Sequence, residues 1–136
     1  MNRSQLDKYI TDYYGVRAER LFEKNPGFQA YRHNDTKKWF AMIMDLPESR
    51  LGLDGQKIID VVNLKCDPIL IGSLRMEQGF YPAYHMNKEN WITVALDERV
   101  PDEKLRMLVD MSYELTRKKL RRKNKYSACL VSRSME

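Results

Sequence analysis

The stretch from Leu64 to Arg121 constrains the fold most, because helix and strand signals follow one another closely in it. Asp67-Pro68 is typical of a helix start, with aspartate as the N-cap and proline in the first turn. Residues 91–96 set Ile, Val and Leu at every second position, which is the period of a half-buried strand. An amphipathic helix then begins at Pro101 and places an apolar stripe on one face. This succession predicts a small α+β domain.

The remainder of the chain supplies a first helix and further strands. Apolar side chains at helical spacing run from Leu6 to Tyr14, after Ser4 as the expected N-cap and before Gly15 as a left-handed C-terminal cap. Asn25-Pro26-Gly27 signals a turn, and residues 17–23 fit either a short helix or a leading strand. The predicted strands span residues 28–32, 39–46, 57–65, 80–86 and 91–96. The expected architecture has two layers, in the order α-βββ-α-ββ-α, with helices on one face of a five-stranded antiparallel sheet.

The composition is that of one folded domain, with 136 residues, 43% of them apolar and 32% charged. We expect this domain at residues 1–123 and a C-terminal tail at 124–136. No apolar run approaches the ~18 residues needed to cross a bilayer, and no secretory signal is visible, so the expected location is the cytoplasm, with no membrane partner. Cys66 and Cys129 lie far apart and outside any CxxC or Cys/His cluster, which argues against a zinc site.

The positive charge is concentrated at the C-terminal end of the chain. Residues 1–100 carry 14 Lys and Arg against 14 Asp and Glu, whereas residues 101–136 carry 10 against 5, which supplies the whole net charge of +5. Seven of these ten bases lie between Arg117 and Lys125. Such a segment either tracks a phosphate backbone or is a solvated helix end that complements the helix dipole.

No arrangement of residues typical of an enzyme is visible. His85 falls on a predicted strand, either as a ligand-contacting or general-base residue or as a partly exposed sheet histidine. Asp60 lies in an otherwise apolar strand and is expected to face solvent or to pair with a base. His33 lies in a hairpin connection, where we expect no role in binding. Because no nucleophile and base, phosphate-binding glycine loop or metal-ligand cluster is spaced for chemistry, we expect no catalysis, no cofactor and no metal.

Aromatic and basic side chains together favour nucleic-acid binding. Trp39, Tyr81, Tyr84 and Trp91 would offer flat rings for stacking if they share one sheet surface, unless they belong to the core. Two hairpins, at residues 34–38 and 87–90, would act as wings whose lysines contact phosphates. The candidate nucleic-acid-binding residues are Lys37, Lys38, Tyr84, His85, Asn87, Lys88, Arg117, Lys118, Arg121 and Arg122.

Several segments resemble the MmcQ/YjbR family of small bacterial proteins. They are Leu64-Lys65, Asp67-Pro68, Leu74-Arg75, the run from Tyr81 to Lys88 (Tyr-Pro-Ala-Tyr-His-Met-Asn-Lys), Trp91-Ile92-Thr93-Val94, and Ser112-Tyr113 with Leu115, together with Trp39 in an early strand. The resemblance implies a two-layer α+β domain similar to secretion chaperones, with DNA binding through a double-wing arrangement of strands. It implies no catalytic activity.

Two other functions stay open. A protein- or peptide-binding module, with another protein or as a homodimer, would hold its partner on an open sheet face or a strand edge. Exposure of Met42, Met44, Met86 or Trp91 would favour this function, because an apolar patch on a soluble protein usually has a partner. The third function is a small-molecule pocket built on His85, Tyr113 and Trp91.

Overall fold

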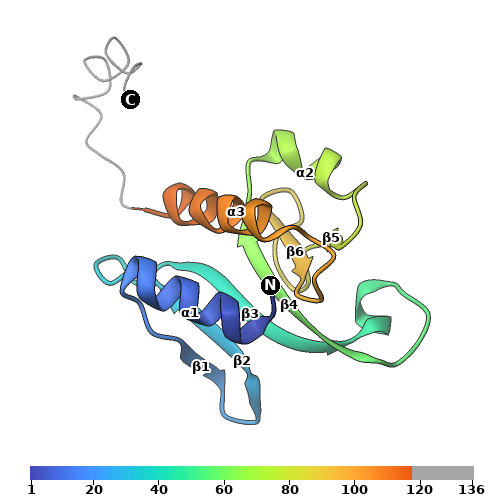
Figure 1. The fold of residues 1–136 in the computed structure, drawn as a ribbon, viewed down its shortest axis with the longest axis horizontal. Helices are drawn as coiled ribbons and strands as arrows, with labels where there is room; N and C mark the ends of the chain where they lie inside the picture. Colours follow the sequence, from blue (N-terminus) through green and yellow to red (C-terminus); the bar gives the residue numbers. More distant parts are fainter. Residues whose placement is uncertain (118–136) are drawn as a thin grey trace.

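The structure, a computed structural model, describes residues 1–117, so the predictions made for Lys118, Arg121, Arg122 and the tail at 124–136 lie outside it. Three helices, a 3-10 turn and six strands follow one another along the chain (Figure 1): α1 (Arg3–Tyr14), β1 (Glu19–Phe22), β2 (Asn25–Arg32), β3 (Trp39–Pro47), η1 (Glu48–Leu51), β4 (Ile58–Lys65), α2 (Pro68–Leu74), β5 (Phe80–Pro82), β6 (Trp91–Ala95) and α3 (Asp102–Leu115). No helix within residues 1–117 has the length and apolar character needed to cross a membrane.

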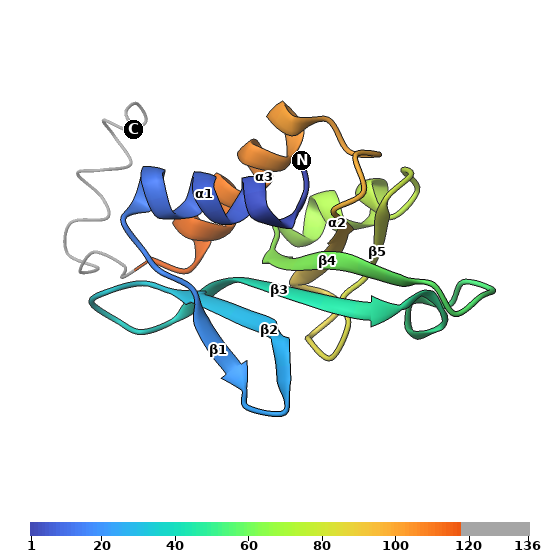
Figure 2. The same cartoon turned by 60° about the horizontal axis from the view of Figure 1, so that its bottom comes forward.

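All six strands form one antiparallel sheet in the order β1-β2-β3-β4-β6-β5. The helices lie on one side of it, and the β1–β2 hairpin bends away toward the other side (Figure 2). The predicted α+β class and antiparallel sheet are confirmed. The sheet has six strands instead of five because residues 19–22 form the leading strand that the sequence left undecided.

The turn predicted at Asn25-Pro26-Gly27 is wrong, since β2 already begins at Asn25 and the hairpin turns at residues 23–24. Gly27 lies inside β2 instead, where the exposed carboxylate of Asp45 on β3 occupies the space beside its Cα. The Gly27 carbonyl accepts a hydrogen bond from Arg3, which joins the start of α1 to β2.

The main core lies between the sheet and the helices. Alternation along each strand turns Val62 and Leu64 of β4 toward the helices, beside Ile92 and Val94 of β6. A smaller cluster on the opposite sheet face contains Met44, Leu46, Ile59 and Val61, with Phe28, Leu51 and Tyr84 packed against it. Both faces of the central strands are therefore buried, as the apolar sequence of β3 predicted.

The helix ends follow the local sequence with one correction. Asn2, not Ser4, is the N-cap of α1; its side chain accepts a hydrogen bond from the Gln5 backbone, and the Gln5 side chain accepts one from the Asn2 backbone. Gly15 ends α1 in the left-handed conformation with φ at 67°, as predicted. Asp67 caps α2 through the Ile69 amide, which confirms the predicted helix start.

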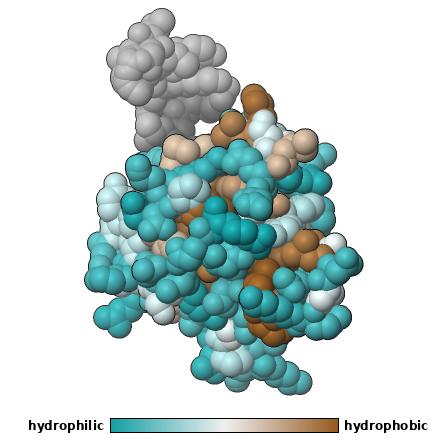
Figure 3. Space-filling model, turned by 45° about the vertical axis from the view of Figure 1, so that its right-hand side comes forward, coloured by the Kyte–Doolittle hydropathy of each residue, from teal (hydrophilic) through white to brown (hydrophobic). Residues whose placement is uncertain are grey.

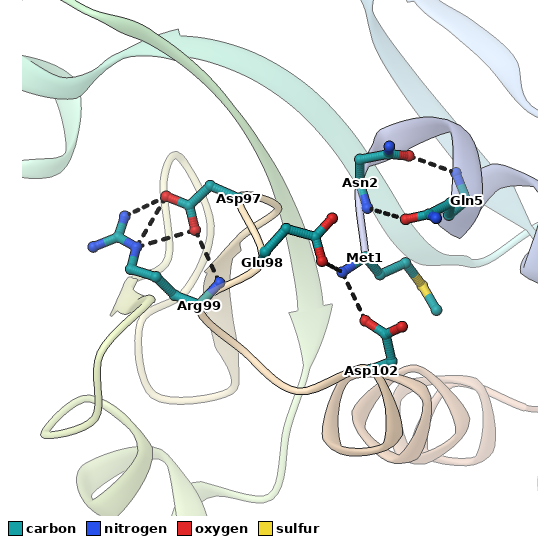
Figure 4. A network of polar contacts seen from close by, with 7 residues as sticks. All are labelled: Met1, Asn2, Gln5, Asp97, Glu98, Arg99 and Asp102. Carbon is teal, nitrogen blue, oxygen red and sulfur yellow. Dashed lines mark hydrogen bonds and ion pairs between the residues drawn. The ribbon is translucent and has the colours of Figure 1, made fainter.

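The N-terminal amine ties α1 to the start of α3 (Figure 4). The Met1 amine lies 2.7 Å from carboxylate oxygens of both Glu98 and Asp102, and Asp102 is in the first turn of α3. Burial disfavours the charged amine, but hydrogen bonds and charge from Asp102 and Glu98 outweigh this cost and raise its pKa above 8.0. Nearby, Arg3 lies 3.8 Å from Asp60, so that unusual strand carboxylate pairs with a base.

Ser112 joins α3 to two strands of the sheet. Its buried hydroxyl donates to the Phe40 carbonyl of β3 at 2.5 Å and accepts from the Lys65 amide of β4 at 2.8 Å. These backbone groups lie where α3 crosses the strand ends, so the serine side chain completes hydrogen bonding there. The C-terminal half of α3 is thereby fixed to one end of the sheet.

We predict that Ser112→Ala lowers the free energy of unfolding by about 2 to 4 kcal/mol, because it leaves the partly buried Lys65 N–H and the buried Phe40 C=O without their partner. Urea unfolding followed by circular dichroism measures this loss. Ser73→Ala, an equivalent change on the exposed side of α2, is the control and should change stability by less than about 0.5 kcal/mol. Equal effects of the two substitutions would show that the Ser112 bridge does not stabilise the fold.

Candidate functional site

Four strand ends meet at one end of the sheet. β2 finishes at Arg32 beside Trp39 of β3, and β4 finishes at Lys65 beside Trp91 of β6. Since these strands are antiparallel, the connection at 33–38 and the loop at 87–90 leave the sheet at the same end. The end of α3 arrives there too, because Thr116 contacts His33.

This end of the sheet gathers cations that lie far apart in the sequence. Lys38 precedes β3, Lys65 ends β4 and Lys88 precedes β6, on three neighbouring strands. With strands ~4.8 Å apart, positions before β3 and β6 are separated by about 10 Å across the sheet. Lys37 and Arg117 complete the group; Arg117 and the hairpin residues Asn34 and Asp35 line one polar hollow of about 440 Å³. Lys37, Lys38, Lys65, Lys88 and Arg117 are called the basic end below.

The basic end is exposed and only loosely held by acids. Lys65 is half-buried, and the other four side chains are exposed. The Arg117 guanidinium lies 2.9 Å from Glu114 in an exposed pair, which contributes little stability and leaves the cation available. Lys88 donates to the Ala83 carbonyl at 2.8 Å, so its ammonium group is held against the loop while its charge stays on the surface.

Two arginines beside the basic end were missed by the sequence analysis. Arg17 and Arg32 line a hollow with Lys37 at the edge of the sheet. The Arg32 guanidinium stands 5.5 Å from the centre of the Trp39 ring and 3.4 Å from Glu19 of β1. No sequence signal placed them there, because their position depends on β1, which the sequence left undecided.

His33 is a buried structural residue at this end, although the sequence suggested only a hairpin position. Its ring packs against Phe40 and Tyr113 and lies 2.7 Å from the Thr116 hydroxyl. Thr116 donates its own proton to the Ser112 carbonyl, so the imidazole Nε2 donates to Thr116. Burial lowers the pKa of His33 below 6.5, which keeps the ring neutral.

The predicted strand through His85 is wrong beyond Pro82. Residues 84–86 form a turn, and His85 has a φ of 57° in the left-handed region. The Tyr84 backbone is satisfied by side chains: its amide donates to the Thr93 hydroxyl, and its carbonyl accepts from the Asn63 amide. His85 is exposed and stacks on the Tyr84 ring with ring centres 3.9 Å apart. Asn87 closes the following turn by accepting from the Glu89 amide.

An apolar groove crosses the sheet face opposite the helices. One wall is the β1–β2 hairpin with Leu21, Phe22 and Phe28, and the other is the turn with Tyr84, His85 and Met86. Both project from the same side of the sheet, where the yellow connection between β5 and β6 hangs below β3 (Figure 2). The groove has a volume of about 130 Å³, and its remaining lining residues are Trp39, Met42, Met44 and Asn63. These ten residues are called the sheet-face groove.

The candidate residues thus divide between the two sheet faces. Tyr113 packs with Tyr14 and Phe40 on the helix side, whereas His85 lies in the sheet-face groove, so the two do not form one small-molecule pocket. Met42 and Met44 are buried, so they do not supply the exposed patch expected of a peptide-binding face. Within residues 1–117, no group of three His, Cys, Asp or Glu side chains is placed to hold a metal ion.

We predict that the stability of this protein falls as the pH is lowered through 6.5. The folded state holds His33 at a lowered pKa, so the unfolded chain takes up the proton first, and the free energy of unfolding rises with pH between the folded pKa and 6.5. Urea unfolding at pH 5.5, 6.5 and 7.5 measures the slope. His33→Gln should reduce it, and His85→Gln, which keeps the buried ring, should not; an unchanged slope in His33→Gln would contradict this account.

Comparison with known proteins identifies the family. A family model described as YjbR matches residues 11–115. The YyaQ protein of Bacillus subtilis is 36% identical over 117 residues, covering 86% of this chain and 99% of its own length. A crystal structure of a Pseudomonas syringae protein superposes with a TM-score of 0.84 at 44% identity, covering 86% of this chain and 100% of that one. A Deinococcus radiodurans protein with a DUF419 domain gives a TM-score of 0.58 at 26% identity over 82% of this chain and 76% of its own. This chain therefore belongs to the YjbR family.

Proposed function

We propose that this protein binds nucleic acid through the basic end and performs no catalysis there. The observation that carries the proposal is the meeting of Lys38, Lys65 and Lys88 at one end of three neighbouring strands. Cations separated along the chain by up to 80 residues, from Lys37 to Arg117, belong to segments that meet at this end of the sheet, which supports a common ligand for them. A surface of this kind suits a polyanion, because each lysine or arginine that neutralises a phosphate releases a counterion.

The dimensions are compatible with a duplex surface. The ~10 Å across the three strands is about the axial rise of three base pairs, at ~3.4 Å each. Lys37 and Lys38 on one hairpin and Lys88 on the loop before β6 contact phosphates on either side of Lys65. This use of two projecting connections corresponds to the double-wing arrangement that the family resemblance implies.

The sequence beyond the described residues adds to the same charge. Arg117 lies at the basic end, and six more Lys and Arg follow it between positions 118 and 125. The predicted contacts of Lys118, Arg121 and Arg122 belong to this segment.

A protein-binding role is the second candidate, favoured by the exposed apolar side chains of α2 and the residues after it. Ile69 is 84% exposed and Met76 is 88% exposed. The apolar surface seen from this side is nevertheless divided into separate patches among hydrophilic atoms (Figure 3). We therefore rank a protein partner or homodimer below nucleic acid, since stable interfaces use a contiguous apolar centre.

We predict that the double variant Lys37→Gln/Lys38→Gln weakens binding to duplex DNA and reduces the slope of log K against log salt concentration by about 1.8, which is ~0.9 for each phosphate that is no longer neutralised. Fluorescence anisotropy with labelled duplex at several salt concentrations measures both quantities. Lys88→Gln should reduce the slope by about half as much.

The matched control is Lys24→Gln/Lys57→Gln, which removes two exposed lysines at the opposite end of the sheet. It should leave the slope nearly unchanged. The proposal fails if the unaltered protein does not bind DNA at low salt, or if the control variant weakens binding as much as the hairpin variant.

A further inference from the structure

The sheet-face groove has the size of one six-membered ring. An apolar cavity of about 150 Å³ lined by aliphatic and aromatic side chains holds a benzene molecule. The groove measures about 130 Å³ and is lined by the rings of Phe22, Phe28, Trp39 and Tyr84 and by methionine side chains. Methionine sulfur and aromatic faces both pack well against flat rings. A single ring fills this volume, whereas a fused double ring would extend out of the groove.

The groove reaches the basic end at Trp39, the first residue of β3. Trp39 lines the groove and lies under the Arg32 guanidinium, directly after Lys38 in the chain. On the other wall, Met86 is two residues before Lys88. Glu19 is the acid paired with Arg32 at this end. A ligand with one ring in the groove therefore has its anionic part close to cations from both walls.

One polar group lies at the floor of the groove. Asn63 is 1% exposed, donates one amide hydrogen to the Tyr84 carbonyl and accepts the Thr93 hydroxyl proton. A primary amide carries two hydrogens and two acceptor sites, so one donor and one acceptor site remain beyond these two bonds within the described chain. A ring with alternating donors and acceptors on its edge can use that capacity, which a benzene-like side chain cannot.

We propose that the sheet-face groove receives a pyrimidine base from a single-stranded nucleic acid held at the basic end. This inference rests on the proposed function and narrows it. A pyrimidine nucleotide combines a single ring, a polar ring edge and a phosphate that the sugar joins to the base. The groove, Asn63 and the flanking cations match these three features in order. Bases within a duplex are paired and stacked, so the groove selects an unpaired base.

The first test uses thymidine, which carries the base without phosphate. The protein is labelled with ¹³C at the methionine methyl groups, and thymidine should shift the methyl resonances of Met42 and Met44. The variants Met42→Leu and Met44→Leu assign these two resonances. Deoxyribose alone should shift neither, and adenosine should shift them less because its base is a double ring. Shifts of equal size at Met76 and Met107, which are exposed on other surfaces, or no shift at Met42 and Met44, would overturn the assignment of the groove.

The second test separates the groove from the basic end. Anisotropy compares oligothymidylate with an abasic oligomer that has the same number of phosphates, and the base-bearing oligomer should bind on the order of tenfold more tightly. Phe22→Ala removes a half-exposed wall of the groove and should abolish that ratio while leaving the salt dependence intact. Tyr13→Ala, an exposed aromatic on α1 away from this face, should preserve the ratio.

The outcomes distinguish the two proposals. If both oligomers bind equally with a normal salt dependence, or if Phe22→Ala keeps the preference, the groove proposal is wrong and the basic end stands. If neither oligomer binds at low salt, the proposed nucleic-acid function itself fails, and the inference drawn from it fails as well.

Discussion

The hydroxyl of Ser112 is the contact on which the candidate site depends. It donates a hydrogen bond to the Phe40 carbonyl of β3 and accepts one from the Lys65 amide of β4, at one end of the sheet. One helical turn later, the Thr116 hydroxyl is hydrogen-bonded to the ring of His33, which lies in the connection between β2 and β3. Together these contacts fix the hairpin, the strand ends and the end of α3 relative to one another. The lysine side chains themselves are long and flexible, so only such backbone anchoring can keep their charges on a common surface. The common position of these segments at the basic end thus depends on the buried hydrogen bonds of Ser112 and Thr116.

The two faces of the sheet have different tasks in this fold. The helix side carries the main core, with tyrosines hydrogen-bonded to acids, as in Tyr31 with Asp7 and Tyr9 with Asp110. The opposite side carries a small cluster and the sheet-face groove, and its walls come from a hairpin and a turn. Because Trp39 lines the groove and directly follows Lys38, the surfaces that we propose for a phosphate backbone and for an inserted base adjoin each other.

Local rules in the sequence predicted much of this fold. The Asp67-Pro68 helix start, the left-handed Gly15 and the strand at β6 are all decided by a few neighbouring residues, and all are observed. The half-buried character predicted for β6 is wrong, because Thr93 and Ala95 are buried as well as Ile92 and Val94. The errors arose where tertiary contacts decide. Residues 19–22 form a strand only because β2 is there to pair with, and residues 84–86 leave the sheet because Asn63 and Thr93 capture the Tyr84 backbone. Similarly, the lysines could be identified from the sequence as candidate binding residues. Arg17, Arg32 and the sheet-face groove could not, because their places in the site depend on how three strands are positioned relative to one another.

The central claim is that strand ends assemble separate cations into one polyanion-binding surface. Amide ¹H–¹⁵N chemical-shift mapping with a short single-stranded oligonucleotide at low salt tests it most directly. We expect the shifted amides to lie at residues 33–38, 65, 84–90 and 113–117, with further shifts at residues 21–25 beside the groove wall, and the amides of residues 52–57 at the opposite end to stay in place. Shifts centred on the opposite end or on α2, or no shifts at all, would contradict the account.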